Sequence, residues 1–378
     1  MKTINRLAWL LLGALAAGGA LAQTGVTATQ ITIGQSAPLS GTNKALGEEI
    51  RNGALAYFRK VNDAGGLHGR RLELVSIDDG NDVKRAGENT QKLIEEQGVF
   101  ALFGYASATL SRPAMPFVDQ HGVPFIHPFT GADPMRVFNK NVYNVRGSYA
   151  DELEKIVEHF ASLSVSRFGI VYYDDVVGKE NLTAVERALK KRNYAPVAVA
   201  AIKDRAKPDV ELAVKEIAKG SPDVVILTTL FKASADFIKL ARKSGLPAQM
   251  ASNSFPGASP LAKELGNEGP GVIVATVVPP FTQAALPIVA EYRAAMDKQF
   301  GNKEYSFTSL ESYIGAKIVA EGVKRAGPKL TRESFTRALD GLTNYDVGGY
   351  FVKFSPTNHN GSSFVELAVI TKNQQFQH

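Results

Sequence analysis

The sequence contains no cysteine among its 378 residues. This absence excludes disulfide bonds, catalysis by a thiol, thiolate metal sites and attachment of a lipid to a cysteine. A chain of this length buries a core large enough to be stable without cross-links. The sequence also lacks a strong excess of either charge, because its 43 basic and 37 acidic residues are interleaved and leave a net charge of +6. Such a small, mixed excess argues against nucleic acid as a partner.

Long hydrophobic runs are confined to the N-terminus. A short basic start precedes the apolar residues 7–19, and residues 20–22 read Ala-Leu-Ala. This order is typical of a secretory signal peptide, so we predict that residues 1–22 are removed by cleavage near Ala22 and that the protein acts in the periplasm. An uncleaved anchor is the alternative, and it is disfavoured because a membrane span needs about 20 apolar residues.

Beyond residue 23 the hydrophobic pattern alternates between the period of a strand and the period of a helix. Strands are expected at 31–33, 72–77, 99–103, 124–126, 168–172, 197–200, 224–227 and 271–274. Helices are expected at 50–61, 182–191, 210–219 and 233–243. The alternation predicts an α/β fold in which helices cover both faces of parallel sheets.

These β/α units form two series, each of about the size of one domain, which predicts two doubly wound parallel-sheet lobes. Residues 141–149 resemble a passage between the lobes, and the helical residues 284–300 and 309–326 are interpreted as a return to the first lobe. A glycine-rich passage at 346–350 precedes the last expected strands, 350–354 and 365–370. We therefore predict a three-segment hinge around a cleft, with lobe 1 at 23–145 plus 278–347 and lobe 2 at 146–277 plus 348–378.

Motifs for metal, cofactor or catalytic chemistry are missing. None of the six histidines stands at metal-ligand spacing from another, and only His127 falls at an expected sheet edge where ligands bind. The acidic residues 78–82 lack the spacing of a calcium loop and are interpreted as a strand-end turn that caps a helix. The phosphate-binding glycine loops, the Gly-x-Ser-x-Gly elbow and His-Glu-x-x-His are absent. We predict no metal, no cofactor and no enzymatic activity.

Two loops of small and hydroxyl residues follow neighbouring expected strands. The first loop runs from Gly104 to Thr109, directly before an expected helix, and the second begins at Phe129. Free N–H groups and hydroxyls at a helix N-terminus bind anions, and two such loops on one edge suit one carboxylate. Ordinary helix capping by Ser107 or Thr109 is the alternative interpretation of the first loop taken alone.

Several separated motifs share a resemblance: ITIG at 31–34, APLSG at 37–41, NDAGGLHG at 62–69, the strand at 72–79 and the loop at Gly104. With them the chain resembles the periplasmic solute-binding proteins of ABC importers, in their branched-chain amino-acid class. The resemblance spans essentially all of the chain after residue 22. It implies the type I periplasmic binding protein fold, in which two lobes close on a small solute and deliver it to the permease subunits.

The resemblance also implies ligand-binding positions. The carboxylate-binding loop of the family falls on Ala106, Ser107, Ala108 and Thr109, and its second loop falls on Phe129, Thr130 and Gly131. In the second lobe, two aromatic positions of the family fall on Val177 and Leu230, and the acid that pairs with the ligand ammonium falls near Ser254. Tyr105, Tyr149, Tyr173 and Phe255 complete the predicted site, although the sequence leaves open whether Tyr105 or Thr130 touches the ligand.

The position near Ser254 departs from the family, because no Asp or Glu lies between Pro247 and Pro260. A buried ammonium group needs an ionised partner. A ligand with a carboxylate and an apolar or aromatic body is therefore expected rather than free leucine. We predict a monomeric receptor for a small carboxylate-bearing solute. A ligand-sensing module of the same fold is the second hypothesis, and a periplasmic enzyme is the third.

Overall fold

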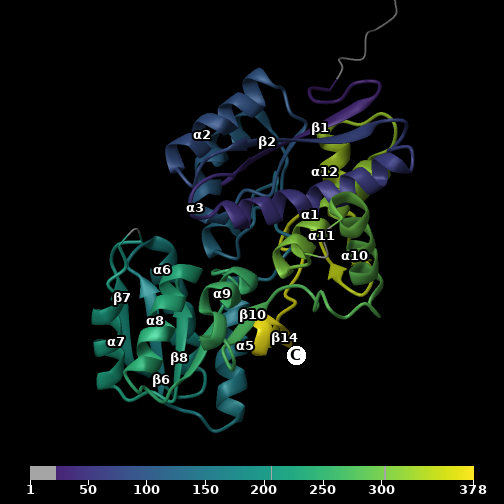
Figure 1. Cartoon of the computed structure of the whole chain (residues 1–378). Coiled ribbons are helices and arrows are strands. Elements are labelled where there is room, and N and C mark those ends of the chain that lie inside the picture. The colour runs from purple at the N-terminus through teal and green to yellow at the C-terminus, as the bar shows by residue number, and fades with distance from the viewer. Residues whose placement is uncertain (1–22, 206, 302–303) are drawn as a thin grey trace, which may run out of the picture.

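A computed structural model describes residues 23–205, 207–301 and 304–378. The predicted signal peptide, residues 1–22, lies outside these residues. The described chain forms two lobes, one above the other in Figure 1. None of the helices in the described part of the chain is both long enough and apolar enough to cross a membrane.

The first lobe is built on a five-stranded parallel sheet with the order β2-β1-β3-β4-β5. Its strands are β1 (Gln30–Ala37), β2 (Arg71–Asp78), β3 (Ala101–Phe103), β4 (Phe125–Ile126) and β5 (Val142–Tyr143). Its helices are α1 (Lys44–Asp63), α2 (Val83–Gln91), α3 (Ser107–Ser111), α4 (Met115–His121), α10 (Pro287–Phe300), α11 (Phe307–Ala326) and α12 (Arg332–Asp340). The N-terminal part of the chain therefore begins the first lobe, and the chain returns at α10 to complete it.

The second lobe is built on a seven-stranded sheet with the order β14-β13-β10-β9-β8-β6-β7. Its strands are β6 (Phe168–Tyr173), β7 (Pro196–Ile202), β8 (Val224–Thr228), β9 (Gln249–Ser252), β10 (Ile273–Thr276), β13 (Glu366–Ile370) and β14 (Phe376–Gln377). Its helices are α5 (Tyr149–Ser162), α6 (Val176–Lys190), α7 (Val210–Lys219), α8 (Phe231–Lys243) and α9 (Ala258–Leu265). Only β13 and β14 run antiparallel to their neighbours. The predicted α/β class with two mainly parallel sheets is thus confirmed.

The chain passes between the sheets three times: after β5, after β10 and before β13. The last passage differs from the expectation that residues 350–354 form a strand of the second lobe. Phe351 and Val352 form β12 and pair with β11 (Tyr345–Asp346) in a separate ribbon. The ring of Phe354 then packs 5.2 Å from that of Tyr143 in the first sheet. The residue boundaries of the two lobes stay a prediction.

Two helices position the charged residues of the cleft. Helix α5 begins directly after the first passage, and a capping box between Ser148 and Asp151 fixes its start. Its next residue, Glu152, is completely buried. Helix α11 packs against α1 and is buried on most sides, which requires small and apolar residues. Glu311 interrupts that pattern within its second turn, so a carboxylate is carried into the interior.

Candidate functional site

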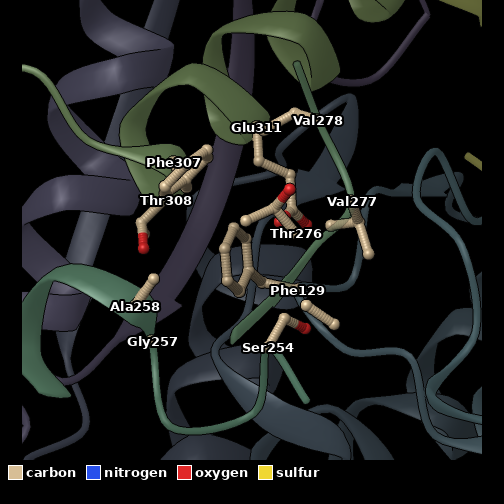
Figure 2. Close-up of a pocket in the computed structure, with 11 residues that line it drawn as sticks. Phe129, Ser254, Gly257, Ala258, Thr276, Val277, Val278, Phe307, Thr308 and Glu311 are labelled. Atoms are coloured by element: carbon tan, nitrogen blue, oxygen red, sulfur yellow. The ribbon is translucent and has the colours of Figure 1, made fainter. Parts of the chain in front are cut away.

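A pocket lies between the two lobes, and both lobes line it (Figure 2). The first lobe contributes Phe129, Phe307, Thr308 and Glu311, and the chain around β9 and β10 contributes Ser254, Gly257, Ala258, Ala275, Thr276, Val277 and Val278. The space open to a water-sized molecule is about 20 Å³. This is room for little more than one water molecule, so a larger guest requires the lobes to move apart.

A buried arginine connects the lobes beside this pocket. Arg146 lies in the first passage and has 1% of its surface exposed. Its Nη2 donates to Oε1 of Glu152 at 2.8 Å and to the hydroxyl of Ser254, both in the second lobe. Its Nη1 lies 3.3 Å from Oε1 of Glu311 in the first lobe. The guanidinium group is therefore held by acids from both lobes.

The cluster has more carboxylates than cations. Burial raises the pKa of Glu311 to about 7, against the opposing effect of Arg146. Burial also raises the pKa of Glu152. The imidazole of His127 lies 3.7 Å from Glu311, but burial and then Arg146 lower its pKa to about 3, so it stays neutral at pH 7. With both acids ionised, the cluster carries one uncompensated negative charge.

Two acceptors at the pocket are left without a hydrogen-bond donor among the described residues. They are Oε1 of Glu311, which makes only ion-pair contacts, and the hydroxyl oxygen of Thr276. Glu311 is 4% exposed and Thr276 is 2% exposed. Figure 2 shows the Glu311 side chain extending from α11 towards Thr276. Buried polar atoms are normally paired, and the Thr276 hydroxyl can donate as well as accept, so a water molecule or a ligand group can pair with each of these two atoms.

The two loops predicted to bind a carboxylate lie side by side. Ala106 and Phe129 form a parallel bridge, and the N–H of Ser107 donates to the carbonyl of Phe129 at 3.1 Å. Ser107 has a left-handed φ of 69°, an uncommon conformation for a non-glycine residue. The N–H groups of Ala108 and Thr109 follow in the first helical turn, where a helix offers no acceptor. The ring of Phe129 lines the pocket and so links it to this loop.

Gly131 and Thr130 bring the second loop against the start of α5. The N–H of Tyr149 donates to the carbonyl of Gly131 at 2.8 Å. A Cβ at Gly131 would lie 2.7 Å from the Tyr149 nitrogen, so only glycine allows this approach. Tyr149 in turn packs against Phe255, with ring centroids 5.7 Å apart, and lies under the Arg146 guanidinium. The structure therefore brings Thr130, Gly131, Tyr149 and Phe255, all of them predicted site residues, together around the first passage between the lobes.

Other predicted residues lie farther from the pocket. The hydroxyl of Tyr173 accepts from the N–H of Leu230 at 3.3 Å, and Arg205 lies over both Tyr173 and Phe255. Val177 is buried in a cluster that contains Tyr149. Tyr105 lies inside the first lobe, where its hydroxyl contacts Thr90 at 3.1 Å and its ring packs on Phe125. Of the predicted site, only Phe129 and Ser254 line the pocket itself.

Two acids lie near Ser254, although residues 247–260 contain none. Ser254 is bonded to Glu152 through its N–H at 2.5 Å and its hydroxyl at 2.9 Å, and Glu311 lines the same pocket. Glu152 lies on α5 and Glu311 on α11, so neither acid is close to Ser254 in the sequence. The sequence carries one sign of this acid: Glu311 is the only charged residue among residues 307–316.

Metal chemistry finds no support in the side-chain arrangement. Within residues 23–205, 207–301 and 304–378, no three His, Asp or Glu side chains come together as a metal ion would require. His127, the histidine at the expected sheet edge, lies instead beside Glu311 and the ring of Phe103.

Comparison with known proteins identifies the family. A family model described as periplasmic binding protein matches residues 30–375. The chain belongs to the periplasmic binding protein family. This family is non-enzymatic, which confirms the prediction that the chain is not an enzyme. The chain is accordingly a solute-binding protein.

Individual periplasmic binding proteins agree with this assignment. The chain is 26% identical over 367 residues to Leu/Ile/Val-binding protein homolog 7 of Brucella suis biovar 1 (strain 1330), covering 92% of this chain and 90% of the relative. A possible leucine/isoleucine/valine-binding protein from Rhodopirellula baltica SH 1 superposes with a TM-score of 0.86 at 28% identity, covering 94% and 98% of the two chains. A periplasmic binding protein type 1 from Bordetella pertussis Tohama I gives a TM-score of 0.82 at 18% identity, covering 92% and 99%, and shows the fold alone. The predicted type I fold is confirmed.

Proposed function

We propose that this protein is an exported receptor that closes on a small carboxylate-bearing solute and delivers it to the permease subunits of an ABC importer. In this proposal the signal peptide is cleaved near Ala22 and the mature protein acts as a monomer in the periplasm. The observation that carries the proposal is the pocket lined by side chains of both lobes. A guest held there stabilises the lobes-together arrangement to the extent that it binds that arrangement more tightly.

The carboxylate of the solute is assigned to the loops at 106–109 and 129–131. Arg146, the buried cation beside the pocket, is already held by Glu152, Glu311 and Ser254. The hydroxyls of Ser107 and Thr109 and the backbone N–H groups in the first turn of α3 are donors on that edge, and they favour a negative charge. The apolar body of the solute would then lie against the pocket rings, Phe129 and Phe307.

A thermal-shift screen of the mature protein tests this proposal. The compounds are L-amino acids, aromatic acids and short fatty acids, each at high micromolar concentration. A ligand at 100 times its Kd adds about 2.7 kcal/mol to the free energy of unfolding and raises Tm. X-ray scattering should show a smaller radius of gyration with any compound that raises Tm. A panel in which no acid shifts Tm contradicts the proposal.

Variants of the first loop test the carboxylate site. Ser107→Ala and Thr109→Val should weaken binding of the acid that the screen identifies, with the Tm of the ligand-free protein within a few degrees of wild type. Ser162→Ala is the control, because its exposed hydroxyl donates to the carbonyl of His159 at the end of α5. Retention of full affinity by both loop variants would remove the loop from the site.

A further inference from the structure

We infer that closure of the two lobes on a solute takes up a proton from solution at Glu311, so that a fall in pH strengthens binding. The inference rests on the proposed function and adds to it a regulation by pH. Glu311 lies on α11 of the first lobe and lines the pocket together with residues of the chain around β9 and β10. Moving the lobes apart uncovers this carboxyl, and closing them removes it from water.

The first argument is the balance of charge. Glu152 and Glu311 both contact one guanidinium, that of Arg146, which is 1% exposed. Two further titratable groups face Glu311, and neither is positive at pH 7. Burial and then Arg146 lower the pKa of His127 to about 3, and burial raises the pKa of the Tyr350 phenol. Two acids and one cation in a buried place carry an excess negative charge, which one proton removes.

The second argument identifies the acid that takes the proton. Glu152 accepts from Arg146 at 2.8 Å and from both the N–H and the hydroxyl of Ser254. Hydrogen bonds to an ionised carboxylate hold it in the ionised form. Glu311 has only a guanidinium nitrogen at 3.3 Å from its Oε1, and that oxygen has no hydrogen-bond donor among the described residues. The less well paired acid, Glu311, is therefore the one expected to carry the proton.

The third argument is the change of burial on closure. Glu311 is 4% exposed with the lobes together, and burial raises its pKa from the ordinary 4.5 to about 7 against the opposing effect of Arg146. The pocket has no room for a solute in this arrangement, so binding passes through an open one in which the carboxyl contacts water. Closure therefore raises the pKa of Glu311, and a solute carboxylate brought into the cleft raises it further.

The size of the effect follows from these two pKa values. At pH 7 about half of the closed molecules carry the proton on Glu311, against almost none of the open ones. By linkage, the affinity should weaken about 10-fold between pH 6 and pH 8. Because the closed protein has the raised pKa, the extra affinity is complete below pH 4.5 and is lost as the pH rises through 7.

Calorimetry with benzoate, 4-methylpentanoate and L-leucine tests the inference, and an acid found only in the wider screen takes their place. The carboxylates of these compounds stay ionised between pH 6 and pH 8, so a change of affinity in that interval belongs to the protein. Titrations in phosphate and in Tris, whose ionisation enthalpies differ, give the number of protons taken up for each molecule bound. A compound that binds should take up about 0.9 proton at pH 6, about 0.5 at pH 7 and about 0.1 at pH 8.

Glu311→Gln should abolish both the proton uptake and the pH dependence, because the amide is neutral like the protonated acid. Its affinity at pH 6 and at pH 8 should stay within a few-fold of that of the wild type at pH 6. Glu333→Gln is the matched control: it removes an exposed carboxylate of the same lobe, paired with Arg337, and should keep the wild-type uptake.

Infrared difference spectra of the wild type with and without the compound give a second measurement that needs no variant. A protonated carboxyl has a C=O stretch separate from the bands of ionised carboxylates, and this band should appear on binding at pH 7. Uptake without such a band would place the proton on another group and overturn the inference.

Other outcomes separate the inference from the proposed function. Proton release on binding, an affinity that does not change between pH 6 and pH 8, or an uptake that persists in Glu311→Gln would each overturn the inference. In all of these cases a compound still binds, so the carboxylate receptor stands. If none of the three compounds binds and the wider acid screen is also blank, the proposed function itself fails, and the inference fails with it.

Discussion

Replacing Arg146 by methionine is the sharpest test of the buried charge cluster. The change leaves Glu152 and Glu311 buried without their cation, while methionine keeps much of the arginine volume. Removing one partner of a buried ion pair costs about 3–5 kcal/mol, a large part of the roughly 5–15 kcal/mol that stabilises a typical domain. We expect a loss of that size at pH 8. At that pH the two buried carboxylates of the variant must either stay charged without a cation or take up protons from a solution that holds few.

The loss should be smaller at pH 5, because burial already raises the pKa of Glu311 to about 7 and both acids can then take up protons. Urea unfolding at both pH values measures the free energy through the midpoint and the slope m. Combining Arg146→Met with Glu311→Gln should recover part of the loss, since it removes one orphaned charge.

Arg192→Met is the matched control. Arg192 pairs with Glu154 on the same helix as Glu152, with N to O at 2.7 Å, but the two side chains are 23% and 31% exposed. A pair of that exposure contributes about 0–1 kcal/mol. Equal losses for the two arginine variants, or a loss at position 146 that does not depend on pH, would refute the electrostatic reasoning.

Three further predictions concern stability alone. Because burial raises the pKa of Glu311 from 4.5 to about 7, the native protein holds that proton more tightly than the unfolded chain. This stabilisation is complete below pH 4.5 and is lost as the pH rises through 7, so the stability of Glu311→Gln relative to wild type should rise by on the order of 3 kcal/mol over that interval in urea titrations. Gly53→Ala should destabilise by about 1–3 kcal/mol, because its Cβ would lie 2.1 Å from the carbonyl of Ser309 where α1 meets α11. Gly87→Ala, also within a helix but with its nearest neighbour at 3.4 Å, should stabilise by about 0.5–1 kcal/mol in the same assay.

Most of the fold was accessible from the sequence because hydrophobic periodicity is a local property. The helix expected at 210–219 matches α7 residue for residue, and the strand expected at 224–227 is β8 but for its last residue. Strand β5 falls within the predicted passage at 141–149, because two buried residues are too few to show a period. The partner of β12 was also missed, since the pairing of short strands depends on tertiary contacts rather than on the strand sequence.

The site was accessible only in part. Small and hydroxyl residues after a strand indicate a loop at a helix start, so the segments at Ser107 and Phe129 were found. The charge cluster is not predicted, because Arg146 and Glu311 are 165 positions apart and become neighbours only when the second passage has returned the chain to the first lobe. No local pattern indicates such a contact, although an acid among uncharged helical residues is a sign that it has a partner elsewhere.

Glu311 connects the pocket to the contact between the two lobes. The same carboxylate faces the pocket and holds Arg146, which holds Glu152 and Ser254 across the cleft. A buried ion cluster is not needed for stability, because well-packed apolar residues stabilise a core equally well. It does, however, require the two lobes to meet in one arrangement, since separating them would leave charges on both sides without partners.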